Sequence, residues 1–583
     1  MENNSLIMQR ARKYAKHESV TDSKSLKIAV MGSCSIQHIS RVLRYLLHEE
    51  CIETDLYEGQ YNGIAMDVLD KSSNLYLFKP DIVIIIPHHE DIQLYPNVLE
   101  TQDRVECKID LEMDYYKKIW NNLSEIEGVQ IIQTNFVIPP LRQYGNMEKK
   151  LCYSASSFLT VLNQRILKEC PSNVTIVDLD EYASDVGKYN WFDYSAYFLY
   201  KLGFRMDYLS EVCNLFVRQI LAAQGKMRKC LVLDLDNTVW GGIIGDDGCE
   251  GIQLDPNNAV GEAYRFFQKY ILSLKNRGVI LAVCSKNDES IAKAPFEKND
   301  NMILKLDDIA CFIANWDDKV QNLKRIAEKL NIGLDSMVFF DDNPAERKLV
   351  RDFLPMVYVV DVPEDPAYYA IQMEKESPFE WQQLTHEDVI RNTNYNSNDK
   401  REKLRETIVD YDAYLRALEM KGHIYALSIE NVQRFTQLIN KSNQFNVRTM
   451  RYTEMDILKY MNDVNYKCLC GELEDKFGDH GLISCIILRR DDSNVFIDTW
   501  VMSCRVLKRG VETMMFERVL EEIKNWGCET LYAQYIETNK NALVRHLYDQ
   551  FGFLQIGYDE ETKSIMYQLT DFEFRGAYNI QKY

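Results

Sequence analysis

Short apolar segments alternate with helix-forming stretches from Lys27 to Phe340, and this alternation most constrains the fold. Buried strands separated by helices pack as parallel sheets with helices on both faces. The pattern predicts two doubly wound parallel-sheet α/β domains in succession. The predicted strands are Lys27–Met31, Asp81–Ile86, Val129–Thr134, Val174–Asp178, Lys229–Asp234, Val279–Cys284 and Met337–Phe340.

The last part of the chain has a different pattern, which predicts an α+β domain. A hairpin is expected from strands His480–Arg490 and Val495–Cys504 around the turn Asp491–Asn494. Helix Glu512–Trp526, strand Thr530–Tyr535 and helix Asn541–Phe551 are expected to follow. The predicted domain limits are 1–222, 223–362, a charged, Asn-rich helical linker at 363–418, and 419–583.

Composition narrows the classes of function. The net charge of −20 argues against nucleic acid as a partner, because nucleic-acid sites need a basic surface. No apolar run approaches the ~20 residues of a membrane span, and the N-terminus lacks an apolar signal core, so neither a membrane nor a secretory role is expected. The 15 cysteines are scattered, which suits a reducing, cytoplasmic location.

Carboxylates follow two of the predicted central strands. Asp234 and Asp236 form a D-x-D pair after the first of these strands, and Asp341 and Asp342 follow the third. Ligands of doubly wound sheets bind at the carboxyl ends of the strands. One carboxylate of the D-x-D pair can attack a phosphorus atom while the other protonates a leaving group. The carboxylate oxygens favour Mg²⁺ as the cofactor.

Two further loops complete the predicted centre. Ser285, Lys286 and Asn287 follow the second strand and offer a hydroxyl and N–H groups for phosphate oxygens, and Lys319 begins a helix and can neutralise negative charge. This order of motifs resembles the haloacid-dehalogenase (HAD) pattern. The short intervals between the motifs leave no room for a large cap domain, so an open centre is expected, with Trp240–Gly251 as a small flap.

Longer runs resemble the FkbH-like proteins. They are Leu231–Gly248, Leu281–Asp288, Val338–Arg351 and, in the last domain, Ile497–Glu512. The resemblance implies an SGNH-hydrolase-like domain, a HAD domain and a GNAT-like acyltransferase domain. It implies that the protein takes the acyl group of 1,3-bisphosphoglycerate, removes the remaining phosphate and loads glycerate as a thioester on an acyl carrier protein in polyketide-type biosynthesis.

The resemblance also assigns roles within the centre. Asp234 is the nucleophile and a metal ligand, Asp236 the general acid/base, and Asp341 a metal ligand with Asp342 as helper. We count all four carboxylates as candidate metal ligands, and Ser285, Lys286, Asn287 and Lys319 as phosphate-binding. Two alternative functions remain open: a Mg²⁺-dependent HAD phosphatase that acts on another phosphorylated or carrier-bound substrate, and a non-catalytic adaptor that docks a carrier protein.

Acyl transfer to a thiol benefits from an enzyme thiolate. Cys504 is the candidate, because a hairpin turn centred between Asp492 and Ser493 brings it near His480, which can take its proton. Cys34 is the rival thiol. His480 can equally be a structural residue of the turn, and buried strand thiols are common.

The flanking domains depart from their parent folds. The N-terminal domain has the Gly32–Ser35 turn and Asn135, but Asp193–Ala196 lacks the histidine of a hydrolase triad, which predicts a binding or scaffolding role. The C-terminal turn lacks the full pyrophosphate-binding motif, so a carrier's phosphopantetheine is the expected ligand there rather than acetyl-CoA, with a basic surface turn that binds no ligand as the alternative. Its candidate residues are Arg505, Lys508, Arg509 and Gly510; Asn440, Asn443 and Gln444 either line the acyl pocket or cap a helix.

Overall fold

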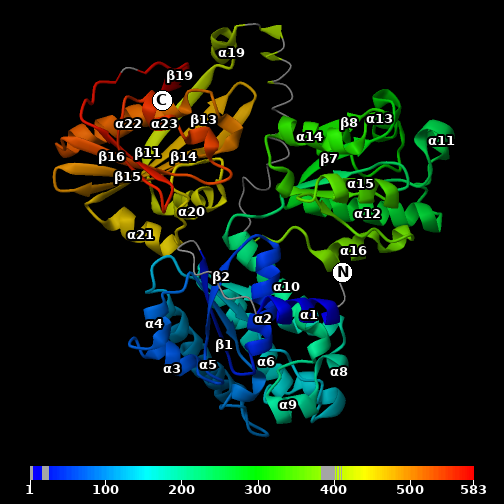
Figure 1. Ribbon diagram of the computed structural model, residues 1–583. Helices are drawn as coiled ribbons and strands as arrows, with labels where there is room; N and C mark the ends of the chain where they lie inside the picture. The colour runs from blue at the N-terminus through cyan, green and yellow to red at the C-terminus, as the bar shows by residue number, and fades with distance from the viewer. Residues whose placement is uncertain are drawn as a thin grey trace. The chain divides into compact units, whose positions relative to one another are not determined.

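The computed structural model describes residues 4–15, 25–381, 401, 404–405, 407–408, 410–574 and 576–582. The chain forms three sheets in sequence order, coloured from blue through green to red (Figure 1). None of the helices in the described ranges has the length and apolarity of a membrane span.

The N-terminal domain is a parallel α/β domain, as predicted. Its strand order is β2-β1-β3-β4-β5. Alternate side chains of β1 enter two separate cores, because successive residues of a strand point to opposite faces. The strands are β1 (Leu26–Gly32), β2 (Thr54–Glu58), β3 (Ile82–Ile86), β4 (Gln130–Thr134) and β5 (Val174–Val177), and the main covering helices are α2 (Gln37–Glu49) and α10 (Leu209–Ala223) on one face, α5 (Gln102–Leu123) and α6 (Ala155–Glu169) on the other.

The central domain repeats this architecture with the strand order β10-β9-β6-β7-β8. All neighbouring pairs are parallel, so every loop that follows a strand lies along one edge of the sheet. The strands are β6 (Cys230–Leu233), β7 (Ile280–Ser285), β8 (Cys311–Ala314), β9 (Met337–Phe340) and β10 (Tyr358–Val359). Helices α12 (Ala259–Asn276) and α16 (Tyr369–Glu376) cover one face, and α14 (Lys319–Leu330) and α15 (Pro344–Phe353) the other.

The C-terminal domain is a mixed sheet packed against α22 (Val511–Trp526). Its order is β17-β18-β16-β15-β14-β13-β11-β19, with β12 paired to β15. The strands are β11 (Met420–Ala426), β12 (Phe445–Asn446), β13 (Tyr466–Asp475), β14 (Gly478–Asp491), β15 (Asn494–Met502), β16 (Thr530–Ile536), β17 (Leu554–Asp559), β18 (Ser564–Leu569) and β19 (Ile580–Lys582).

Two sequence predictions for this domain need correction. Strand β15 ends at Met502, not at Cys504, because a 3₁₀ turn, η8 (Cys504–Val506), begins there. The helix predicted from Asn541 to Phe551 is two short pieces, η9 (Ala542–Val544) and α23 (Leu547–Gln550).

Both ends of the predicted linker 363–418 belong to domain cores. Tyr369 and Met373 of α16 are buried in the central core, and Tyr414 and Leu415 of α19 (Tyr411–Ala417) in the C-terminal core. These residues bury apolar side chains in the domain cores, whereas the residues of a linker stay exposed to solvent. Residues 382–400, which include the Asn-rich stretch, lie outside the described ranges. The other predicted domain limits stay predictions.

Candidate active site

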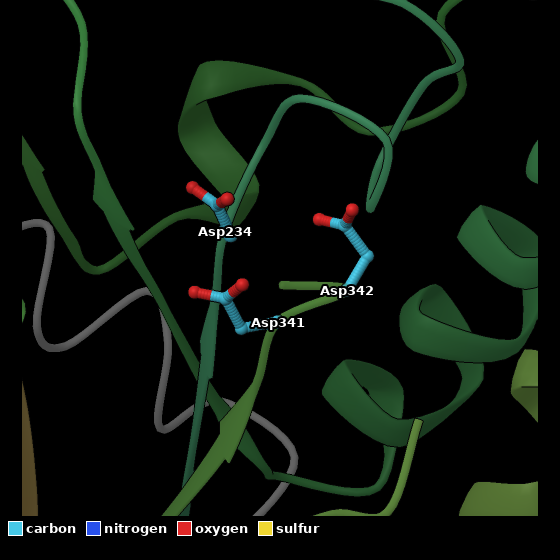
Figure 2. Close-up of side chains that lie close together, drawn as sticks. All are labelled: Asp234, Asp341 and Asp342. Atoms are coloured by element: carbon cyan, nitrogen blue, oxygen red, sulfur yellow. The ribbon is translucent and has the colours of Figure 1, made fainter. Parts of the chain in front are cut away.

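Three carboxylates gather at the carboxyl ends of two neighbouring strands. Asp234 follows β6, and Asp341 and Asp342 follow β9. The Asp234 backbone N–H donates to the Phe340 oxygen at 3.0 Å, which extends the pairing of the strands into the loops. One oxygen from each carboxylate lies within 4.8 Å of the others (Figure 2). The structure therefore brings these three predicted residues together, and their roles stay predictions.

Lys319 neutralises part of this negative charge. It is the first residue of α14, and its Nζ lies 2.5 Å from Asp341 Oδ2 and 3.0 Å from Asp234 Oδ2. The side chain is almost wholly buried, and a buried ammonium needs such partners. Burial alone would lower the pKa of Lys319, but the two carboxylates outweigh it and raise that pKa, so the lysine stays charged.

One lysine does not balance three carboxylates. Burial, followed by the charge of Asp234, raises the pKa of Asp341 to about 7 and raises that of Asp342 as well. Asp234 Oδ1 is buried and has no hydrogen-bond partner in the part of the chain that the structure describes. Carboxylate repulsion together with an unpartnered oxygen suits a divalent cation with oxygen ligands, so these residues fit Mg²⁺.

Asp236 is oriented differently from the other three carboxylates. Its Oδ1 accepts hydrogen bonds from Trp240 Nε1 and the Ile244 N–H, both at 3.0 Å, and its Oδ2 accepts one from Asn287 Nδ2 at 2.9 Å. Asp236 is not one of the three carboxylates that cluster among the described residues, and its place among the metal ligands stays a prediction. A fixed carboxylate beside the nucleophile suits proton transfer.

The predicted phosphate loop follows β7. Ser285 and Asn287 are buried, and Asn287 Nδ2 also donates to Ser285 Oγ at 3.2 Å. Both side chains therefore lie beside Asp236, and we call Ser285, Asn287 and Asp236 the floor of the site. Lys286 is exposed, and its Nζ lies 2.6 Å from Glu346 Oε1, so its ammonium is already paired. Its role in phosphate binding stays a prediction.

Sequence reasoning missed two residues that hold the loops. Thr238 is fully buried, and its hydroxyl bonds the Asp342 carboxylate and accepts from the Asp342 N–H, each at 3.2 Å. Arg347 Nη1 donates to the backbone oxygens of Asp341 and Asp342 at 2.7 Å. The position of Thr238, two residues after the D-x-D pair, is a usable sequence signal for the first, whereas no local pattern marks Arg347.

The ring of His480 contacts residues other than the predicted Cys504. The register beside the turn is as expected, since Asp491 pairs with Asn494, but the ladder ends where Ser484 meets Met502. His480 is buried, and its Nε2 lies 3.0 Å from Asp475 Oδ2 and 3.3 Å from Arg509 Nη1. His480 therefore belongs to a buried ionic network and is not placed as the base for the half-buried Cys504.

Asp475 is the centre of that network. Arg401 donates to both of its oxygens, at 2.7 and 2.6 Å, and Arg509 Nη1 lies 3.2 Å from Oδ2. Burial alone would raise the pKa of Asp475, but hydrogen bonds from His480 and Arg401 outweigh it and lower that pKa. Burial lowers the pKa of His480 to about 4. The network is thus Asp⁻ with two arginines and a neutral histidine.

The other predicted residues of the C-terminal turn lie around Cys504. On this domain the thiol shares one depression with basic and polar side chains: Arg401, Arg405, Tyr411, Tyr414, Gln444, Arg505, Lys508 and Arg509. Gly510 precedes α22 with φ +87°. Asn440 and Asn443 are half-buried at the end of α20 (Val432–Lys441). Local positive charge beside a thiol suits an anionic acyl donor or a phosphopantetheine.

The rival thiol Cys34, and Cys284 beside the phosphate loop, are poor nucleophiles. Cys34 and Cys284 are buried, and burial raises the pKa of each to about 12. Asn135 is buried as well, donating to Asp178 and accepting from the Asp180 N–H. Asp193 caps α9 (Tyr194–Tyr200) through the Ala196 N–H at 3.0 Å, which is a structural use of that aspartate.

Comparison with known families gives two matches. Residues 27–221 match the model described as FkbH, N-terminal domain, and residues 432–553 match that of the acetyltransferase (GNAT) family. The C-terminal domain is therefore GNAT-like, as predicted. A search of curated proteins found no significant match.

Solved structures add a relative that includes the central domain. The chain is 34% identical to the N-terminal part of a Bacteroides fragilis protein that contains a phosphatase domain and was crystallised with Mg, with a TM-score of 0.60 over 66% of this chain and 100% of that chain. Escherichia coli ribosomal-protein-S18-alanine N-acetyltransferase is 13% identical over 27% of this chain and 99% of its own, with a TM-score of 0.21.

Proposed function

Because the chain belongs to the FkbH-like family of HAD-superfamily proteins, we propose that it is a glyceryl transferase/phosphatase. It combines a HAD-type phosphatase domain with a GNAT-like domain, so it has features of a phosphatase and of an acyltransferase. Its proposed substrates are 1,3-bisphosphoglycerate and an acyl carrier protein, which receives glycerate as a thioester.

The cluster of Asp234, Asp341 and Asp342 around Lys319 carries the phosphatase half of the proposal. When bound, Mg²⁺ would be held by these three carboxylates and would neutralise charge on the phosphoryl group. Lys319 adds a fixed positive charge beside the nucleophile. The relative crystallised with Mg supports this choice of ion.

Phosphate removal then follows from the positions of the side chains. A carboxylate oxygen of Asp234 attacks the phosphorus while the bond from phosphorus to the ester oxygen breaks. Asp236, held by Asn287 and Trp240, gives the leaving oxygen its proton. Water hydrolyses the aspartyl phosphate, a proton returns to Asp236, and inorganic phosphate leaves. The small flap and the open, capless centre stay part of the proposal.

For the transfer half, we assign the acyl-accepting thiol to Cys504. The sulfur attacks the carbonyl carbon of the acyl phosphate, the bond from that carbon to the phosphate oxygen breaks, and the phosphate leaves with the proton of the thiol. The pantetheine thiol of the carrier then attacks the same carbon, the bond from that carbon to the Cys504 sulfur breaks, and the proton of the pantetheine thiol passes to that sulfur. The basic side chains of the surrounding depression favour an anionic donor. Because His480 faces Asp475, the thiol proton is not assigned to that imidazole.

Mass spectrometry of the carrier protein tests the proposal. The full-length chain, holo carrier, 1,3-bisphosphoglycerate and Mg²⁺ should yield a glyceryl adduct on the carrier. Asp234→Asn should yield the phosphoglyceryl adduct instead, and Cys504→Ala should give neither the carrier adduct nor an acylated enzyme. Phosphate release without any adduct would favour the alternative, a Mg²⁺-dependent phosphatase with another substrate, and no turnover at all would favour the adaptor.

A further inference from the structure

Trp316 is an exposed indole at the edge of the central sheet that carries the catalytic residues. It lies in the loop after β8, three positions before Lys319, and 72% of its surface is exposed. An indole that stays in water does not contribute the favourable free energy of burying its large apolar surface. An isolated exposed apolar residue needs no explanation, but one beside a catalytic centre suggests contact with a ligand.

The loop that carries Trp316 is held by hydrogen bonds. Asn315 Oδ1 accepts from the Asp317 N–H at 3.0 Å and from Asn322 Nδ2 at 2.7 Å. Asp318 caps α14 through the Gln321 N–H at 2.8 Å. The indole Nε1 donates to Asp288 Oδ1 at 3.4 Å. The exposure of the ring is therefore a property of an ordered loop, which presents its face to solvent at low entropic cost.

The indole is hydrogen-bonded to the loop after β7 that also holds the general acid. Asp288 directly follows Asn287, whose amide holds Asp236. A second exposed apolar side chain, Ile243, is 46% exposed and directly precedes Ile244, whose N–H also holds Asp236. Exposed apolar side chains therefore lie on two loops at the edge of the sheet that carries the polar groups of the site.

These two surfaces suit different parts of one substrate. The polar side chains of the site can bind a phosphate group. Each of the three carbons of glycerate bears oxygen, so glycerate has little apolar surface to pack against an indole. A pantetheine arm supplies methyl and methylene groups. We propose that Trp316 is a specificity-determining residue that packs on the pantetheine arm of a phosphorylated acyl thioester. Dephosphorylation then follows thioester formation, an order that rests on the function proposed above.

The reaction is hydrolysis of the phosphate ester only. Asp234 forms a bond to phosphorus as the phosphorus–oxygen bond to the acyl chain breaks, and Asp236 protonates the released alkoxide. Water cleaves the aspartyl phosphate and returns a proton to Asp236. The carbon–sulfur bond of the thioester is untouched, so the products are inorganic phosphate and the glyceryl thioester.

The experiment compares phosphate release from 3-phosphoglyceryl-pantetheine and from 3-phosphoglycerate, with Mg²⁺ and the full-length chain. Trp316→Ala should raise KM for the thioester about tenfold, which corresponds to about 1.4 kcal/mol, with kcat and the KM for 3-phosphoglycerate unchanged. Trp316→Phe should keep most of the affinity. Phe353→Ala is the matched control, because Phe353 is 66% exposed at the far end of α15.

Three results would overturn the inference: an unchanged KM for the thioester, an equal rise for both substrates, or an effect that appears only with the complete carrier protein. The last result would assign Trp316 to a protein surface instead of the arm. If the unmodified chain released no phosphate from either substrate, the proposed function itself would fail, and that result is distinguishable from these three.

Discussion

At the residue scale, the site depends on a charge balance that Lys319 and a cation share. The lysine is buried against Asp234 and Asp341, and Asp342 adds a third carboxylate. Removing one partner of a buried ion pair leaves the other charges without compensation, which costs more than the pair contributes when intact. Lys319 is therefore expected to contribute to the stability of the domain as well as to catalysis.

Lys319→Met should lower phosphate release by about 10²–10³-fold and reduce the free energy of unfolding by about 3–5 kcal/mol without metal. Mg²⁺ should restore part of the stability, because it supplies the missing positive charge. Phosphate assays and thermal unfolding in EDTA and in Mg²⁺ measure both effects. Lys286→Met is the control and should change stability by about 1 kcal/mol at most, since its pair with Glu346 is partly exposed. Equal effects of the two substitutions would contradict the assignment.

His480 makes the C-terminal domain sensitive to mild acid. Burial lowers its pKa from 6.5 to about 4, with Arg401 and Arg509 adding to the shift and Asp475 opposing it. Below pH 6.5 the histidine of the unfolded chain takes up a proton while that of the folded chain stays neutral. The free energy of unfolding therefore decreases as the pH is lowered from 6.5 to about 4. The full loss by about pH 4 is about 3 kcal/mol, at 1.36 kcal/mol for each pKa unit.

Urea unfolding at pH 7.5 and pH 5.0 tests this. His480→Gln should lose less stability between the two values than the unmodified chain, because glutamine does not titrate. Asp475 stays ionised at both values, since its pKa is lowered. His546→Gln is the control, with a side chain that is 73% exposed. A pH dependence that His480→Gln leaves unchanged would refute the role of this imidazole.

At the element scale, the sequence predicted which residues come together where those residues follow a strand of the central sheet. Asp234, Ser285 and Asp341 each follow an apolar segment, so their convergence follows from a parallel sheet. It failed where partners are distant or elements end early. Arg401 lies in the predicted linker yet bonds the buried Asp475, and β15 stops before Cys504. Hydrophobic periodicity carries no signal for either.

The turn between η8 and α22 depends on two left-handed residues. Gly510 has φ +87°, and a Cβ there would lie 3.0 Å from Tyr578 Cβ. Gly510→Ala should destabilise the domain by about 1–2 kcal/mol. Lys508→Gly, at φ +62°, should be neutral or stabilise by about 1 kcal/mol, because glycine adopts this conformation without strain. Chemical denaturation distinguishes them, and an opposite order of stability would be inconsistent with this turn.

At the scale of the whole molecule, the apolar cores on the two faces of the central sheet are separate from the core of the C-terminal sheet. The Bacteroides fragilis relative was crystallised as an N-terminal part that corresponds to 66% of this chain. We expect the first two domains of this chain to fold without the third, because a domain with its own core can fold alone.

A fragment of residues 1–381 should keep Mg²⁺-dependent phosphate release from 3-phosphoglyceryl-pantetheine, with kcat within about threefold of the complete chain. It should not form any acyl-enzyme from 1,3-bisphosphoglycerate, because Cys504 is absent. Phosphate assays and intact-mass measurement test the two halves separately. A folded fragment that released no phosphate would show that the C-terminal domain completes the phosphatase centre, and the Asp234→Asn fragment serves as the inactive control.

The bond between Thr238 and Asp342 joins positions that are 104 residues apart in the chain. Because the two loops meet only once β6 and β9 have paired, no early or partial form of this domain can contain a working centre. Phosphate hydrolysis therefore requires the native pairing of these strands. As denaturant is added, catalytic activity and the folded central sheet should be lost in one transition.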